Sequence, residues 1–105
     1  MLIVTTETIV WKEILEVKGL VRGSTVRSKH LGNDIAAAFK NLAGGELNSY
    51  NDMLTEARQI AIGRMVEDAE AKGANAIIGM RLMSSSVMSG AAEMVAYGTA
   101  VVIND

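Results

Sequence analysis

The chain has 105 residues, of which 50% are hydrophobic and 21% charged, and its formal net charge is −2. This composition indicates one folded domain over residues 1–105 and excludes a disordered chain. Ten Lys and Arg give no net basic field, so nucleic acid and anionic membranes are not expected partners.

Two strands are predicted in the N-terminal part of the chain. Residues 2–6 form a short strand, and residues 8–12 form a turn. Residues 13–27 alternate between apolar and polar types, which predicts a long half-buried strand. Gly19 and Gly23 within it predict a bulge or a bend. The apolar row of this strand consists of Leu15, Val17, Gly19, Val21 and Gly23.

Two helices are expected next. Residues 33–42 predict a short helix that ends at the double glycine 44–45. A longer helix is expected to begin at a capping Asn48 or Ser49 and to end at Gly73. Its apolar stripe consists of Tyr50, Met53, Leu54, Ala57, Ala61, Met65 and Ala69. Asp68 and Lys72 have the spacing of a favourable helical ion pair.

The last third of the chain predicts a hairpin. Its strands are expected over residues 75–85 and 92–103, joined by a Ser-rich loop over 84–90. Both strands are mostly apolar on both faces; one row is expected to be Ala76, Ile78, Met80 and Leu82. One long helix covers only one face, so we expect the other face to meet another subunit. The element order predicts an α+β fold, with a two-layer antiparallel sheet and its helices on one face.

Several stretches of the sequence together resemble a known family. These are residues 21–23 (Val-Arg-Gly), 44–46 (Gly-Gly-Glu), 57–58, 64–65, 73–81 and 96–101. In this order and spacing they resemble the YbjQ-like family of uncharacterised bacterial proteins. The resemblance implies a dodecin-like β-α-β-β subunit with short accessory strands that assembles into a pentameric ring. It also implies a heavy-metal ion as a cofactor, because members are often labelled as heavy-metal-binding.

The residue types give little support to the metal hypothesis. The chain has no Cys and one His, His30, whereas soft metals prefer thiolate and imidazole ligands. Seven Met residues could supply thioethers for Cu(I), but methionine is more often a core or interface residue. The candidate metal ligands are therefore His30 and the loop residue Met88.

An anion site is the other binding hypothesis. Arg22 and Arg27 flank Gly23, Ser24 and Thr25, and such a segment can bind phosphate or carboxylate through its N–H groups and cations. It lacks the spacing and the Lys of a P-loop. A solvated strand end is the alternative interpretation.

Arg81 is a further candidate ligand residue. It lies among apolar residues of a strand that we expect to be covered, and a buried Arg needs a partner. That partner is either a carboxylate, from Glu93 or a neighbouring subunit, or a bound anion.

Three functions follow in order of preference. The first is a non-enzymatic homo-oligomer, expected to be a pentamer, that binds a small ligand or metal ion at its subunit interfaces. The second is a scaffold for a protein partner. The third is an enzyme with His30 as its base. A cytoplasmic location is expected, because the sequence shows no signal peptide and no apolar run of membrane-spanning length.

Overall fold

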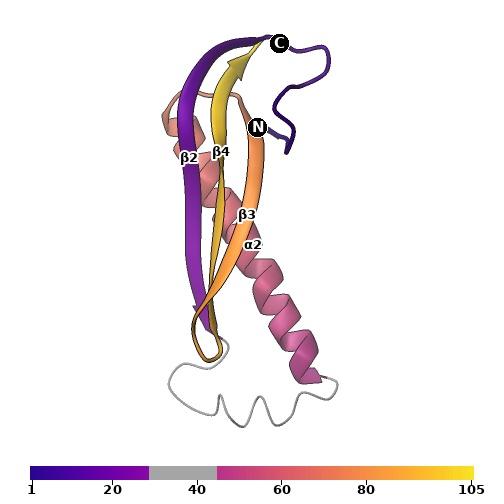
Figure 1. Cartoon of the computed structure of the whole chain (residues 1–105), viewed down its shortest axis with the longest axis vertical. Helices are drawn as coiled ribbons and strands as arrows, with labels where there is room; N and C mark the ends of the chain where they lie inside the picture. The colour runs from indigo at the N-terminus through magenta and orange to yellow at the C-terminus, as the bar shows by residue number, and fades with distance from the viewer. Residues whose placement is uncertain (29–44) are drawn as a thin grey trace.

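The computed structural model describes residues 1–28 and 45–105. In these residues one helix, α2 (Gly45–Ala71), packs against a four-stranded sheet (Figure 1). The strands are β1 (Leu2–Ile3), β2 (Ile14–Ser28), β3 (Ala76–Met88) and β4 (Ala91–Ile103), in the spatial order β1-β3-β4-β2. The predicted two-layer α+β fold is confirmed. The short helix expected over 33–42 lies outside the described residues.

The sheet is mixed rather than wholly antiparallel. Strands β2, β4 and β3 are antiparallel neighbours, but β1 pairs in parallel with β3 through Leu2 and Ala76. The pairing continues beyond β1, because the Met80 N–H donates to the Val4 carbonyl at 3.0 Å. The prediction of an antiparallel sheet is therefore wrong at this edge. The long connection through β2 and α2 allows the parallel arrangement, which a short hairpin turn would not.

A bulge at Gly19 changes which residues of β2 face the helix. The register shifts between Val17, which pairs with Val101, and Gly19, which pairs with Ala100. Gly19 has φ +110°, a conformation that other residues rarely adopt. The extra residue moves the following alternation to the other face. Leu15 and Val17 are therefore exposed, and the single apolar row predicted for this strand is wrong before the bulge.

A second bulge, in β3, also moves the side chains that follow it to the other face of the sheet. Its register shifts between Ile78 and Arg81, around Gly79 at φ +61°. Ile77 and Leu82 consequently share one face, while Ile78 and Arg81 share the other. The predicted row of Ala76, Ile78, Met80 and Leu82 is split by this shift.

The core lies between α2 and the sheet and consists mostly of small side chains. Its buried members are Val21, Ala57, Ala61, Met65, Ala69, Ile77, Met94, Ala96 and Ala100. The stripe predicted for the helix is thus confirmed at its buried positions. The helix packs mainly on β2 and β4, and it comes so close to Gly23 that a Cβ there would overlap the Ala61 carbonyl. Gly23 is a contact point between layers, not the predicted bend.

The structure confirms the predicted C-terminal end of α2 but not its predicted N-terminal end. The helix stops where predicted, with Gly73 at φ +79° and its N–H donating to the Glu70 carbonyl at 3.0 Å. It begins at Gly45, however, so Asn48 and Ser49 lie inside the helix and the predicted caps are wrong.

The hairpin is confirmed, but its loop is shorter than predicted. Strand β3 runs through the serines to Met88, and only Ser89 and Gly90 separate it from β4. Gly90 has φ +75°, a left-handed conformation that glycine adopts readily in turns. The Ser-rich segment assigned to a loop is therefore an exposed strand.

Candidate functional site: the open face of the sheet

The sheet face opposite α2 is only partly covered. Near the chain termini, Ile9 and Ile14 pack there on Ala76, Val101 and Ile103. Farther along the strands the face is bare. We call this bare region the open face; its exposed apolar side chains include Val17 (64%), Leu20 (67%), Val26 (57%) and Met83 (55%). Exposed apolar residues gathered on one surface indicate a binding surface more strongly than single ones do.

A row of one tyrosine between two arginines crosses the open face. Tyr97 on β4 pairs with Arg22 on β2 and with Arg81 on β3. Paired residues share a face, and their Cβ atoms lie about 5 Å apart. Arg22 and Arg81, two of the predicted ligand residues, thus lie on the strands on either side of Tyr97, on the same face of the sheet. Two guanidinium groups on one face can bind a carboxylate or a phosphate.

Arg81 is held at the edge of this face. It is exposed, and its Nη1 donates to the Thr5 carbonyl at 2.8 Å and to the Met80 carbonyl at 2.9 Å. The expectation that Arg81 is buried in this chain is wrong, because α2 covers the other face. Glu93 pairs with Val26 and Ser85 instead, four residues along β4 from Tyr97.

Strand alternation divides the remaining candidates. Ser24 lies on the open face, two residues from Arg22. Thr25 is buried at 9% exposure on the helix side, and Arg27 pairs there with Glu56, with Nη2 and Oε1 2.5 Å apart. The structure therefore brings Arg22, Ser24 and Arg81 to one face and leaves Thr25 and Arg27 on the other. The segment lies within β2, and its side chains alternate between the two faces of the sheet.

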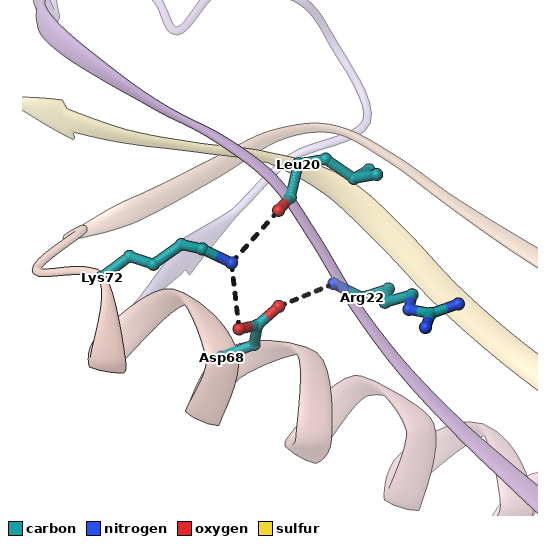
Figure 2. A network of polar contacts seen from close by, with 4 residues as sticks. All are labelled: Leu20, Arg22, Asp68 and Lys72. Carbon is teal, nitrogen blue, oxygen red and sulfur yellow. Dashed lines mark hydrogen bonds and ion pairs between the residues drawn. The ribbon is translucent and has the colours of Figure 1, made fainter.

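Polar side chains of α2 and of Lys72, the residue after it, occupy the outer edge of β2. The Asp68 carboxylate accepts the Arg22 N–H at 3.2 Å and pairs with Lys72 at 3.1 Å (Figure 2). Lys72 also donates to the Leu20 carbonyl at 3.3 Å. The hydrogen bonds from Lys72 and from the Arg22 backbone lower the pKa of Asp68 below its ordinary value. We call these four residues the β2 edge network; the ion pair within it was predicted.

The metal candidates do not converge in the described part of the chain. His30 lies outside it, and no group of three or more His, Asp or Glu that could hold a metal occurs in residues 1–28 and 45–105. Met88 is 64% exposed at the end of β3, whereas Met94 is buried under the helix. Met83 lies on the open face, so the thioethers point to different sides of the sheet. The described donors therefore do not fit a soft-metal site.

The signal for the site was partly present in the sequence. Arg81 was selected as a cation among apolar residues and Arg22 as a cation beside Gly23, Ser24 and Thr25, but Tyr97 was not selected as a ligand residue. Its place between them depends on the register of three strands, which the bulges at Gly19 and Gly79 set. The described helix α2 is not apolar enough to span a membrane.

Comparison with known proteins gives a consistent family match. A family model described as "Putative heavy-metal-binding" matches residues 1–104. A UPF0145 protein of Clostridioides difficile is 74% identical over 105 residues, which are 100% of this chain and 94% of that protein. A UPF0145 protein of Clostridium perfringens is 73% identical and covers 100% of this chain and 99% of its own length.

A solved structure shares the fold. It is the crystal structure of a protein of unknown function from the DUF74 family of Pediococcus pentosaceus. The TM-score is 0.62 at 19% identity, over 99% of this chain and 98% of that one. At this identity the similarity shows the fold alone.

Proposed function

The chain belongs to the YbjQ-like family of UPF0145 proteins, and from this premise we propose that it is a non-catalytic homo-oligomer whose subunits meet through the open face. We further propose that the row of Arg22, Tyr97 and Arg81 binds a small anion at that interface. A dodecin-like ring of five subunits and a cytoplasmic location, both expected from the sequence, remain part of the proposal.

The exposed apolar side chains support the assembly. Val17, Leu20 and Val26 lie on one long strand, and each is more than half exposed. Burying a side chain of this size contributes about 1.5–3 kcal/mol. A domain of this length buries a modest share of its own surface, so assembly adds to its stability. The bare open face is the observation on which this proposal rests.

The charges of the open face support an anionic ligand over a metal cation. Arg22 and Arg81 are both exposed and flank the half-buried Tyr97. Neither has a carboxylate partner for its side chain among the described ion pairs. Covering two cations at an interface without compensation is costly, so a bound carboxylate or phosphate would stabilise the assembly.

The assembly is tested by native mass spectrometry of untagged protein and of Leu20→Glu. We expect a homo-oligomer for the wild type and a monomer for the variant, because a carboxylate at the centre of an apolar interface loses its hydration. Val87→Glu is the control, since Val87 is 52% exposed near the hairpin turn, away from the centre of the open face. A monomeric wild type, or equal dissociation of both variants, would refute the proposal.

The ligand is tested separately by titrating inorganic phosphate and citrate against the assembled protein. We expect binding that weakens about tenfold in Arg22→Gln and in Arg81→Gln, because each removes one charge-assisted hydrogen-bond donor. Isothermal calorimetry gives the affinities, and Arg27→Gln on the helix side is the matched control. Equal weakening by the control would show a general effect of net charge instead of a site.

A further inference from the structure

The outer edge of β3 is a surface distinct from the open face and from the β2 edge network. Beyond Met80, no strand of the described residues pairs with this edge, because β1 ends at Ile3 and its extension reaches only to Gly79 and Met80. Residues from Arg81 to Met88 are all exposed. The C-terminal part of β3, from Arg81 to Met88, is therefore a free strand edge, and such edges bind extended chains.

The register identifies which backbone groups are free. The Arg22 N–H points away from β4 and donates to Asp68, so Arg22 and Tyr97 are a pair that is not hydrogen-bonded to each other. The N–H and C=O groups of Tyr97 therefore point to β3. Arg81, which pairs with Tyr97, therefore bonds to β4. Alternation then directs the N–H and C=O groups of Leu82, Ser84 and Ser86 away from the sheet.

The same residues line a groove on the helix side. Leu82 pairs with Ala96 and Ser84 with Met94, both of which are core positions under α2. The helix lies over β2 and β4 and makes little contact with β3, which leaves a shallow groove of about 210 Å³. Leu82, Ser84, Met94 and Arg58 line it, together with Met83, whose side chain strand alternation places on the open face.

Arg58 gives this groove its chemistry. It is the one charged residue of the lining, and its Nη2 donates to the Thr55 hydroxyl at 3.1 Å. No carboxylate pairs with it among the described residues. The remaining guanidinium N–H groups can receive an acidic side chain.

We propose that the outer edge of β3 from Leu82 to Ser86 binds an extended peptide segment of a partner protein by strand addition. An acidic residue of the segment lies opposite Ser84 and pairs with Arg58, while an apolar neighbour two positions away packs on Leu82. Main-chain hydrogen bonds provide the affinity, and the groove selects the side chains. A second copy of this chain fits less well, because its β3 edge presents another cation and its β2 edge is occupied by Lys72, Asp68 and Arg64.

The probe is a capped peptide of lysine, valine, threonine, glutamate, threonine, valine and lysine in that order. It reads the same in both directions, so both strand orientations present glutamate between two valines on one face. Binding is followed by amide chemical shifts and hydrogen exchange of the full chain. We expect the amides of Leu82, Ser84 and Ser86 to gain protection, while the open face around Leu20 and Tyr97 does not respond.

Two variants separate the parts of the site. Arg58→Gln should weaken binding of the glutamate peptide about fivefold, because the ion pair with Arg58 is lost. Binding of a matched glutamine peptide should be unchanged, because that peptide forms no ion pair with Arg58 in either protein. Ser84→Pro removes an outward N–H without touching the bonds to β4 and should abolish binding of both peptides. Arg27→Gln, on the other edge, is the control.

Three results would overturn the proposal. One is peptide binding that Ser84→Pro leaves intact, and another is a response confined to the open face. The third is protection of Leu82, Ser84 and Ser86 in the free protein, which would show that another copy already covers the edge. None of these depends on assembly through the open face, so the two proposals can fail separately.

Discussion

The two outer edges of the sheet meet the helix differently. On β2 the Leu20 carbonyl, the Arg22 N–H and the Ser24 carbonyl are bonded by Lys72, Asp68 and Arg64 of α2 and its C-terminal turn. On β3 the equivalent groups of Leu82, Ser84 and Ser86 have no such partner among the described residues. Residues 20–24 of β2 and residues 82–86 of β3 both lie on an outer edge of the sheet, so position in the sheet alone does not decide which edge can pair with another chain. The placement of the helix does.

Gly23 explains that placement. A helix can approach a strand closely only where both lack bulky side chains, and Gly23 faces Ala61 across the layers. The close contact brings the polar side chains of α2 within reach of the β2 edge. On β3 the helix-side positions hold Leu82 and Ser84, which the helix does not cover.

The strongest test of this comparison is Gly23→Ala. The added Cβ would overlap the Ala61 carbonyl and the Met65 nitrogen, which are backbone atoms of the helix and cannot rotate away. We expect the free energy of unfolding to fall by about 1–3 kcal/mol, the usual cost of overpacking. The Arg22 amide should also exchange faster, because the helix moves away from the β2 edge. Urea denaturation and hydrogen exchange measure the two effects.

Gly63→Ala is the matched control for that change. Gly63 lies in α2, and a Cβ there meets nothing within 4 Å. Alanine has the higher helix propensity, so this variant should gain roughly 0.5–1 kcal/mol in stability. A gain of stability in Gly23→Ala as well would mean that the close contact at Gly23 does not hold the helix in place.

The sequence predicted local features of the fold well. The stripe of Ala57, Ala61 and Met65 and the stop at Gly73 depend on helical spacing and on glycine geometry, which are local properties. The faces of β2 and β3 were predicted less well. A single inserted residue moves all following side chains to the other face, and the sequence does not show on which side of Gly19 or Gly79 the insertion lies.

The candidate site shows the same limit. Arg22, Ser24 and Arg81 were selected from their neighbours in the sequence, and the structure places them on one face. Thr25 and Arg27 were selected in the same segment as Arg22 and Ser24, but strand alternation places them on the helix side of the sheet. The groove at Arg58 could not be inferred, because it exists only where α2 leaves β3 uncovered.

The smallest expected effect concerns the charge that holds the β2 edge. Asp68→Asn keeps an oxygen that can accept the Arg22 N–H but removes the negative charge opposite Lys72. Because the Asp68 side chain is 37% exposed, solvent screening limits the loss of stability at neutral pH to about 0.5–1 kcal/mol. Urea denaturation across a pH series measures it. Glu67→Gln, at the neighbouring exposed carboxylate, is the control and should change stability by less than about 0.5 kcal/mol.

The lowered pKa of Asp68 sets the direction in which stability changes with pH. In the folded state the pKa of Asp68 is lowered, so its charge stabilises the fold above the unfolded pKa, and that contribution is lost as the pH falls through the folded pKa. The difference in unfolding free energy between wild type and Asp68→Asn should therefore be constant near neutral pH and close as the solution becomes acidic. The Arg22 amide should lose protection over the same acidic range. A difference that persists below the folded pKa would mean that the side-chain charge of Asp68 does not hold the β2 edge, and the contrast with β3 would then rest on the packing at Gly23 alone.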